Sequence, residues 1–193
     1  MPGKFSQQLG FGQVGEGLIS RWLQSRGCLI FPAYEMETKD GEPKPGPRMF
    51  SANGNLILPD MLAFGERQMF WVEAKRKTCF TWHRNSQKWV TGVDQHHYEQ
   101  YVQVSEKTGL PVWIMFWHPS ESPDVIDTKH DCPSECPTGL FGGDIRNLML
   151  NESHRWKFYG RSGMVYWAHE SLKCIASVED VLKATHQFTQ AAE

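Results

Sequence analysis

The sequence predicts an α/β fold in which a mixed central sheet of four or five strands is flanked by helices. Three observations carry this prediction: an amphipathic helix near the start, two closely spaced strands, and a second helix followed by six consecutive apolar residues. In chain order, residues 13–118 form an α-β-β-β-α-β core. Residues 119–193 form a less regular C-terminal extension, and the length of 193 residues suits a single domain, 1–193.

The first half of this core is a helix followed by three strands. Residues 13–26 place apolar side chains on one face at helical spacing, and residues 28–31 form a short strand. Strands over 55–64 and 68–76 are separated by a three-residue turn, 65–67. This close spacing favours a hairpin.

The second half is a helix and a buried strand. Residues 78–93 are polar, aromatic and aperiodic, which indicates a loop. A helix is expected over 94–107, and the apolar run 112–117 suits a buried central strand. Prolines mark residues 119–137 as loop, and the expected elements beyond are a short helix within 140–150, a strand over 163–168 and a closing helix over 178–188.

Composition restricts the functional class only loosely. Neither a membrane-spanning apolar run nor an apolar signal core is found, so we expect a cytoplasmic protein without a membrane partner. Five scattered cysteines do not suggest a disulfide framework. The net charge of −2 does not indicate a nucleic-acid partner, but the stretch from Lys75 to Lys88 holds five basic residues and no acidic one.

The chemistry of the sequence is concentrated in the predicted hairpin. Glu73 and Lys75 lie two residues apart in an apolar strand, so their side chains share one face, and Asp60 lies in the partner strand. A charge on a buried sheet face is costly unless it is paired or bound to a metal. Two carboxylates there can hold Mg²⁺, which keeps water and phosphate in its other positions, and Lys75 can orient a water molecule or stabilise developing negative charge.

The sequence Leu58-Pro59-Asp60, followed after twelve residues by Glu73-Ala74-Lys75, resembles the signature of the PD-(D/E)XK nuclease superfamily. The resemblance covers about residues 13–118. It implies the restriction-endonuclease-like or Holliday-junction-resolvase-like core, an α-β-β-β-α-β unit. It also implies that Asp60, Glu73 and the backbone carbonyl of Ala74 bind Mg²⁺, and that Lys75 assists hydrolysis of a phosphodiester bond.

Two further positions extend the resemblance. Many members carry a glutamate in the first helix that supports the metal site, and Glu16 matches it. Some members carry Gln-x-x-x-Tyr in the helix after the lysine strand, whereas Gln95 and Tyr98 are only three residues apart here. Gln95 is therefore predicted as a contact of phosphate or metal-bound water, outside that subfamily motif.

A basic and aromatic segment follows the lysine strand directly. Its cations can pair with phosphates and its rings can stack on unpaired bases. The competing interpretation is that Trp82 and Trp89 simply pack a long loop onto the core. The predicted nucleic-acid contacts are Arg76, Lys77, Trp82, His83, Arg84, Lys88 and Tyr98.

A possible structural zinc site is the last candidate. His130, Cys132 and Cys136 occupy a proline-rich loop, and zinc takes four nitrogen or sulfur ligands. Cys-x₃-Cys is not the usual Cys-x₂-Cys spacing, so free thiols in an irregular loop are the alternative.

The sequence thus favours a Mg²⁺-dependent deoxyribonuclease in which Mn²⁺ can substitute. The choice of DNA rests on the resemblance, and nothing in the residues excludes RNA. Many branched-DNA nucleases of the superfamily act as dimers, which makes a homodimer a further expectation. The alternatives are a catalytically silent module that binds nucleic acid or protein on the same scaffold, and a zinc-stabilised interaction domain.

Overall fold

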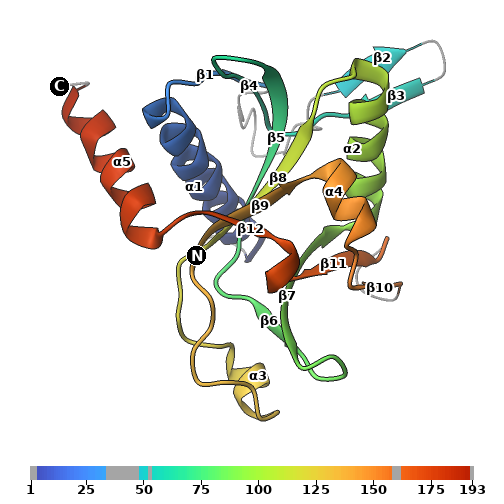
Figure 1. Ribbon diagram of the computed structural model, residues 1–193, viewed down its shortest axis with the longest axis vertical. Coiled ribbons are helices and arrows are strands. Elements are labelled where there is room, and N and C mark those ends of the chain that lie inside the picture. Colours follow the sequence, from blue (N-terminus) through green and yellow to red (C-terminus); the bar gives the residue numbers. More distant parts are fainter. Residues whose placement is uncertain (1–3, 34–47, 52–53, 158–161, 192–193) are drawn as a thin grey trace.

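A central sheet with helices on both faces organises the molecule (Figure 1). The computed structural model describes residues 4–33, 48–51, 54–157 and 162–191. The sheet has six strands in the order β1-β4-β5-β8-β9-β12, in which β5 and β8 are parallel and the other neighbours antiparallel. The strands are β1 (Leu29–Pro32), β4 (Met61–Phe64), β5 (Met69–Arg76), β8 (Val112–His118), β9 (Gly139–Asp144) and β12 (Lys173–Ala176). The predicted mixed α/β class is confirmed, with six strands rather than four or five.

Helices cover both faces of the central sheet. α1 (Lys4–Ser25) and α5 (Val178–Ala191) contact each other and lie on one face, whereas α2 (Gln95–Thr108) and α4 (Ile145–Leu150) lie on the other (Figure 1). Each face has its own apolar core, because the buried residues divide into one cluster on the α1 side and one on the α2 side. A short helix, α3 (Val125–Thr128), and a 3₁₀ turn over His169–Ser171 complete the helical elements of the described ranges.

A second sheet of four strands packs beside the first. Its order is β10-β11-β7-β6, formed by His154–Trp156, Met164–Ala168, Lys88–Asp94 and Thr81–His83. The prediction of a loop over 78–93 is therefore wrong, because β7 gains its regular structure by pairing with β11, a strand far along the chain. The expected irregularity of the C-terminal extension is corrected as well, since it supplies β9 and β12 to the central sheet and β10 and β11 to the second sheet.

The strand predicted over 55–64 is divided in two. β3 (Gly54–Ile57) pairs with β2 (Arg48–Ser51) in a separate hairpin, and β4 begins only at Met61. Pro59 lies between them, and proline lacks the N–H that a continuous ladder needs. β4 and β5 form the expected hairpin, with Met61 opposite Val72. Asp60 thus lies one residue before β4, next to Glu73 on β5.

The remaining predicted elements are found close to their expected limits. The helix over 94–107 is α2, the apolar run is β8, the strand over 163–168 is β11 and the closing helix is α5. The segment 140–150 is divided between the end of β9 and α4. The first helix begins at Lys4 instead of residue 13. No helix in the described ranges combines the length and apolar character needed to cross a membrane.

A glycine sets how closely α1 approaches the strand that carries Glu73 and Lys75. A Cβ added to Gly15 would lie 2.5 Å from the Cβ of Arg76, whereas one added to Gly17 would meet nothing within 4 Å. Gly15 therefore allows direct backbone packing of α1 on β5, and its neighbour Glu16 is held beside the sheet.

Gly15→Ala is expected to lower the free energy of unfolding by about 1–3 kcal/mol, because the added methyl group must push α1 away from β5. Gly17→Ala is the matched control and should raise it by up to about 1 kcal/mol through helix propensity. Urea unfolding of both variants measures the difference. Equal effects of the two substitutions would contradict close packing at Gly15.

Candidate active site

Three of the predicted residues meet where the β4–β5 hairpin begins. The Asp60 carboxylate accepts a hydrogen bond from the backbone N–H of Ala74, with 2.8 Å between Oδ2 and N. The ammonium group of Lys75 pairs with Oε1 of Glu73. The side chain of Glu73 is only 1% exposed, and its second oxygen, Oε2, has no hydrogen-bond partner among the described residues. The hairpin register, predicted from the sequence, thus brings the two carboxylates and the lysine together.

The electrostatics of this cluster are strongly coupled. Burial, together with the negative charges of Glu73 and Glu16, raises the pKa of Asp60 well above its usual value, and Lys75 offsets only part of this effect. Burial alone would lower the pKa of Lys75, but the neighbouring Glu73 and Asp60 carboxylates raise it above its usual value. The neighbouring carboxylates therefore keep Lys75 in its charged form at neutral pH.

Glu16 on α1 belongs to the same cluster, as its position in the first helix predicted. Burial raises its pKa, the charge of Lys75 lowers it and that of Glu73 raises it further. Three carboxylates thus face one ammonium group, and the cluster carries excess negative charge when all are ionised. A divalent cation is the ligand that this imbalance favours.

Gln95 lies elsewhere, and this part of the prediction is corrected. Its backbone N–H donates to the carbonyl oxygen of Gly163, and its side-chain amide donates to Glu99 at 2.7 Å. These contacts direct Gln95 toward the second sheet instead of toward Glu73. The residue two positions later, His97, is the one that the first turn of α2 presents to the cluster.

His97 is not among the site residues predicted above from the sequence. It is half-buried, and burial and the charge of Lys75 lower its pKa, while Glu73 and Asp94 raise it. Two residues on a helix differ by about 200° in direction, so Gln95 and His97 cannot face the same way. The signal in the sequence was the spacing of His97 from Tyr101, which equals the four-residue spacing of the family motif.

The predicted nucleic-acid residues are distributed over different environments. Burial and the nearby Lys75 lower the pKa of Lys77 to about 8. Arg76 packs against α1 at Gly15. Arg84 and Lys88 are exposed in and beside the turn between β6 and β7.

The aromatic members of that prediction differ in the same way. Trp82 packs against Trp89 with 5.0 Å between ring centroids, as the competing interpretation expected. His83 belongs to a stack of rings on the second sheet. Tyr98 is 2% exposed, and its hydroxyl donates to Glu152 at 2.8 Å, so its assignment to a nucleic-acid surface is wrong.

The predicted zinc ligands lie in the segment between α3 and β9. Cys136 is buried and its thiol donates to the carbonyl oxygen of Phe80 at 3.9 Å, while Cys132 and His130 are half-buried. Within the part of the chain that is described, no group of three His, Cys, Asp or Glu side chains is arranged to hold a metal ion. The five cysteines are free thiols.

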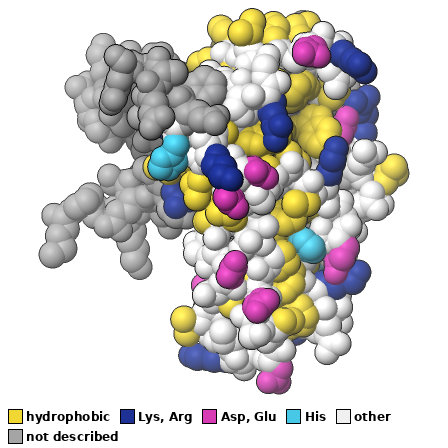
Figure 2. Space-filling view, turned by 60° about the vertical axis from the view of Figure 1, so that its left-hand side comes forward, with side chains coloured by type: hydrophobic (Ala, Val, Ile, Leu, Met, Phe, Trp, Pro, Cys, Tyr) yellow, Lys and Arg dark blue, Asp and Glu magenta, His cyan; other side chains and the backbone are white. Residues whose placement is uncertain are grey.

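The face of the molecule on which α1 and α5 lie carries mixed charges (Figure 2). Acidic, basic and apolar side chains are interspersed over its described residues, without a broad area of one sign. The described residues in this view therefore form no basic surface of the kind that binds a polyanion.

The similar solved structures include two nucleases at low sequence identity. The Holliday junction resolvase Hjc of Archaeoglobus fulgidus is 9% identical, with a TM-score of 0.46 over 83% of this chain and 85% of that chain. D212, a nuclease from a fusselovirus, is 12% identical, with a TM-score of 0.41 over 100% of this chain and 98% of that chain. No family model and no curated protein sequence matches this chain.

The donors present at the site fit a hard divalent cation. Glu73 Oε2 is a buried carboxylate oxygen without a hydrogen-bond partner among the described residues, and Asp60 lies next to it along the hairpin. Mg²⁺ typically takes only one or two protein carboxylates and completes its octahedron with water and phosphate. A complete protein cage, which the described residues do not form, is therefore not required for this ion.

Proposed function

We propose that this protein is a nuclease that hydrolyses phosphodiester bonds, with DNA as the substrate and Mg²⁺ as the metal ion. The observation that carries the proposal is Glu73, a buried carboxylate with one oxygen on Lys75 and the other without a hydrogen-bond partner in the described residues. Lys75 compensates one negative charge, but Asp60 and Glu16 add two more carboxylates to the same cluster, and a further cation would balance them. The choice of DNA is supported by the resemblance of Asp60, Glu73 and Lys75 to the PD-(D/E)XK signature.

Asp60 and Glu73 are the residues that would hold the metal, with Glu16 adding negative charge nearby. When bound, Mg²⁺ neutralises charge on a phosphate and acidifies a coordinated water molecule. The hydrogen bond from Ala74 fixes the Asp60 carboxylate at the start of β4. Lys75, a cation at neutral pH, donates to the phosphate oxygens and stabilises the negative charge that develops as the bond breaks.

His97 has the chemistry to take part in proton transfer. Its lowered pKa leaves the imidazole neutral at pH 7, and its charged form would interact with both Glu73 and Lys75. A neutral imidazole can accept a proton from water or donate to a phosphate oxygen, depending on its tautomer.

The test is cleavage of labelled single-stranded, duplex and branched DNA with Mg²⁺, with Mn²⁺ and with a chelator. We expect cleavage that requires metal and is lost in Asp60→Asn and Glu73→Gln. Glu66→Gln is the matched control, because Glu66 is an exposed carboxylate in the turn at the far end of the same hairpin. Cleavage that survives Glu73→Gln would contradict the proposed mechanism, and tight binding without cleavage would favour the silent binding module.

Metal binding is tested separately from activity. Added Mg²⁺ should raise the thermal midpoint of the unaltered protein, since a ligand that binds only the folded state stabilises it. The same addition should leave the midpoint of Asp60→Asn unchanged. An equal rise in both proteins would show that the metal binds elsewhere.

A further inference from the structure

The outer face of the second sheet carries aromatic rings where polar side chains are usual. Residues that alternate along its strands divide between two faces. The inner face is part of the core and includes Trp89, Val93, Val165 and Trp167. The cross-strand pairs His154–Tyr166 and Tyr166–Gly92 lie on the opposite face, in line with Trp156 and His83.

Three of these rings form a continuous stack. The centroids of His83 and His154 are 4.0 Å apart with 13° between the ring planes, and those of His154 and Tyr166 are 4.7 Å apart with 7° between the planes. His154 is the middle ring, so side chains from β6, β10 and β11 are aligned over the sheet. Trp156, two residues from His154 on the same face, is 51% exposed.

A glycine in β7 makes room for this stack. A Cβ on Gly92 would lie 2.8 Å from Cδ1 of Tyr166 and would also collide with the carbonyl oxygen of Val165. Glycine weakens the interior of a strand, and it often marks a place where another group must approach the backbone closely. Its presence here lets the Tyr166 ring lie against the sheet, so that the parallel rings are built into the fold.

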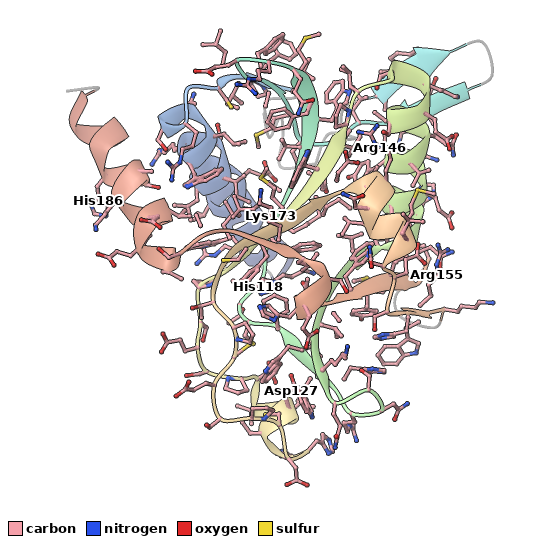
Figure 3. The ribbon with its side chains drawn as sticks, in the orientation of Figure 1. His118, Asp127, Arg146, Arg155, Lys173 and His186 are labelled. Atoms are coloured by element: carbon pink, nitrogen blue, oxygen red, sulfur yellow. The ribbon has the colours of Figure 1, made fainter. Side chains whose placement is uncertain are left out.

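Charges around the rings suit a polyanion. Lys88 is paired in register with His83, Arg84 follows His83, and Lys157 follows Trp156. The acids on this side have partners already: Asp94 accepts from the first turn of α2 and from Ser162, and Glu152 pairs with Arg155. Arg155 lies on the other face of this sheet, since it pairs in register with Val165 and its guanidinium lies over the Tyr98 ring; Figure 3 shows it beside β10 and β11.

The aromatic face is also continuous with the candidate active site. Trp156 on β10 pairs with Met164 on β11, and Met164 pairs in turn with Asp94 at the end of β7. Asp94 is also the N-cap of α2. The backbone N–H of the next residue, Gln95, donates to the carbonyl oxygen of Gly163, which directly precedes β11. His97, beside Glu73 and Lys75, is in the same first turn of α2.

We propose that His83, the outer ring of this stack, and the exposed Trp156 on the same face form a stacking platform for unpaired bases of a nucleic-acid strand whose phosphodiester backbone lies at Glu73 and Lys75, with His154 and Tyr166 stacked beneath His83 as its support. Aromatic rings flanked by cations bind single strands with little sequence preference, because every base has a ring face to stack. The inference rests on the proposed nuclease function. It makes single-stranded or branched nucleic acid, rather than continuous duplex, the substrate class.

The experiment measures binding in the presence of a chelator, which separates it from cleavage. Fluorescence anisotropy compares a labelled oligothymidylate with a labelled duplex of the same length. The variants are Trp156→Ala and the double variant His83→Ala with Trp156→Ala. Phe50→Ala is the matched control, because Phe50 is an exposed ring, 76% accessible, on the separate β2–β3 hairpin.

We expect the double variant to bind oligothymidylate about tenfold to a hundredfold more weakly and the duplex less than about twofold more weakly. Trp156→Ala alone should also weaken binding of oligothymidylate more than binding of duplex, with a smaller loss of affinity than in the double variant. It serves as the test if the double variant fails to fold. An unchanged affinity for oligothymidylate, or an equal loss of affinity for oligothymidylate and duplex, would contradict the proposed stacking platform.

Two further outcomes separate this inference from others. A shift from dimer to monomer in Trp156→Ala, seen by sedimentation, would show that the face binds a second copy of the chain and would overturn the proposal. Selective loss of single-strand binding in a protein that cleaves nothing would support the platform and contradict the proposed nuclease function.

Discussion

Lys75→Met is expected to lower the free energy of unfolding by about 3–5 kcal/mol at pH 7 and to reduce cleavage by about 10²–10³-fold. The reason is the burial of its partner. Glu73 is 1% exposed, and Lys75 is the cation bonded to it, so removal of the ammonium group leaves a buried carboxylate without compensation. Chemical unfolding in the presence of a chelator measures the loss of stability.

A second substitution distinguishes this electrostatic cause from loss of packing. Glu73→Gln added to Lys75→Met removes the uncompensated charge and should recover most of the lost stability, without recovery of cleavage. Lys183→Met is the matched control, because Lys183 forms an exposed ion pair with Glu179 on α5, and it should cost no measurable stability. A double variant as unstable as Lys75→Met would contradict the charge argument.

His118→Leu is expected to make the protein less sensitive to acid. His118 is fully buried at the end of β8, where its ring stacks on Phe80 with centroids 3.8 Å apart. Figure 3 shows it at the centre of the molecule. Neither ring nitrogen makes a well-formed hydrogen bond among the described residues. Burial, with the charges of Lys77 and His169, lowers its pKa to about 3, and the nearby backbone of Cys79 opposes this only partly.

The direction of the pH effect follows from this depressed pKa. As the pH is lowered below 6.5, the unfolded chain takes up a proton at this histidine while the folded chain does not. The free energy of unfolding therefore decreases as the pH is lowered from 6.5 to about 3. The full loss amounts to about 5 kcal/mol. His118→Leu should remove this dependence and, because two unsatisfied polar atoms are lost, stabilise the protein at pH 7 by about 1–3 kcal/mol.

Unfolding free energies at several values between pH 3 and pH 7 provide the test. The control is His186→Leu, at an exposed position on α5 (Figure 3), which should retain the acid sensitivity of the unaltered protein. If His118→Leu keeps the original slope, the acid sensitivity originates in other groups.

The sequence was most informative where chemistry and local structure coincide. Asp60, Glu73 and Lys75 could be placed together because a short hairpin fixes which residues of two strands are neighbours. The position of Glu16 could be anticipated because it lies on the predicted amphipathic helix beside that hairpin. In each case the spacing along the chain determines the spacing in the fold.

The predictions failed where a distant partner decides the structure. The polar residues and Gly92 of β7 gave no alternating pattern, and the strand forms because β11 pairs with it from far along the chain. The prediction for Gln95 was wrong about which side of α2 faces the active site. The sequence located α2 correctly, but packing of its buried residues Tyr98 and Tyr101 determines which side of the first turn faces the active site.

The six-stranded sheet has a consequence for synthesis of the chain on the ribosome. Glu73 and Lys75 emerge before β8, the strand that pairs with theirs, and one edge of β8 stays exposed until β9 follows after residues 119–138. An exposed apolar strand edge such as that of β8 can pair with other chains or bind chaperones. The strand that pairs with the Glu73 strand therefore gains its second partner only after β9 has been synthesised.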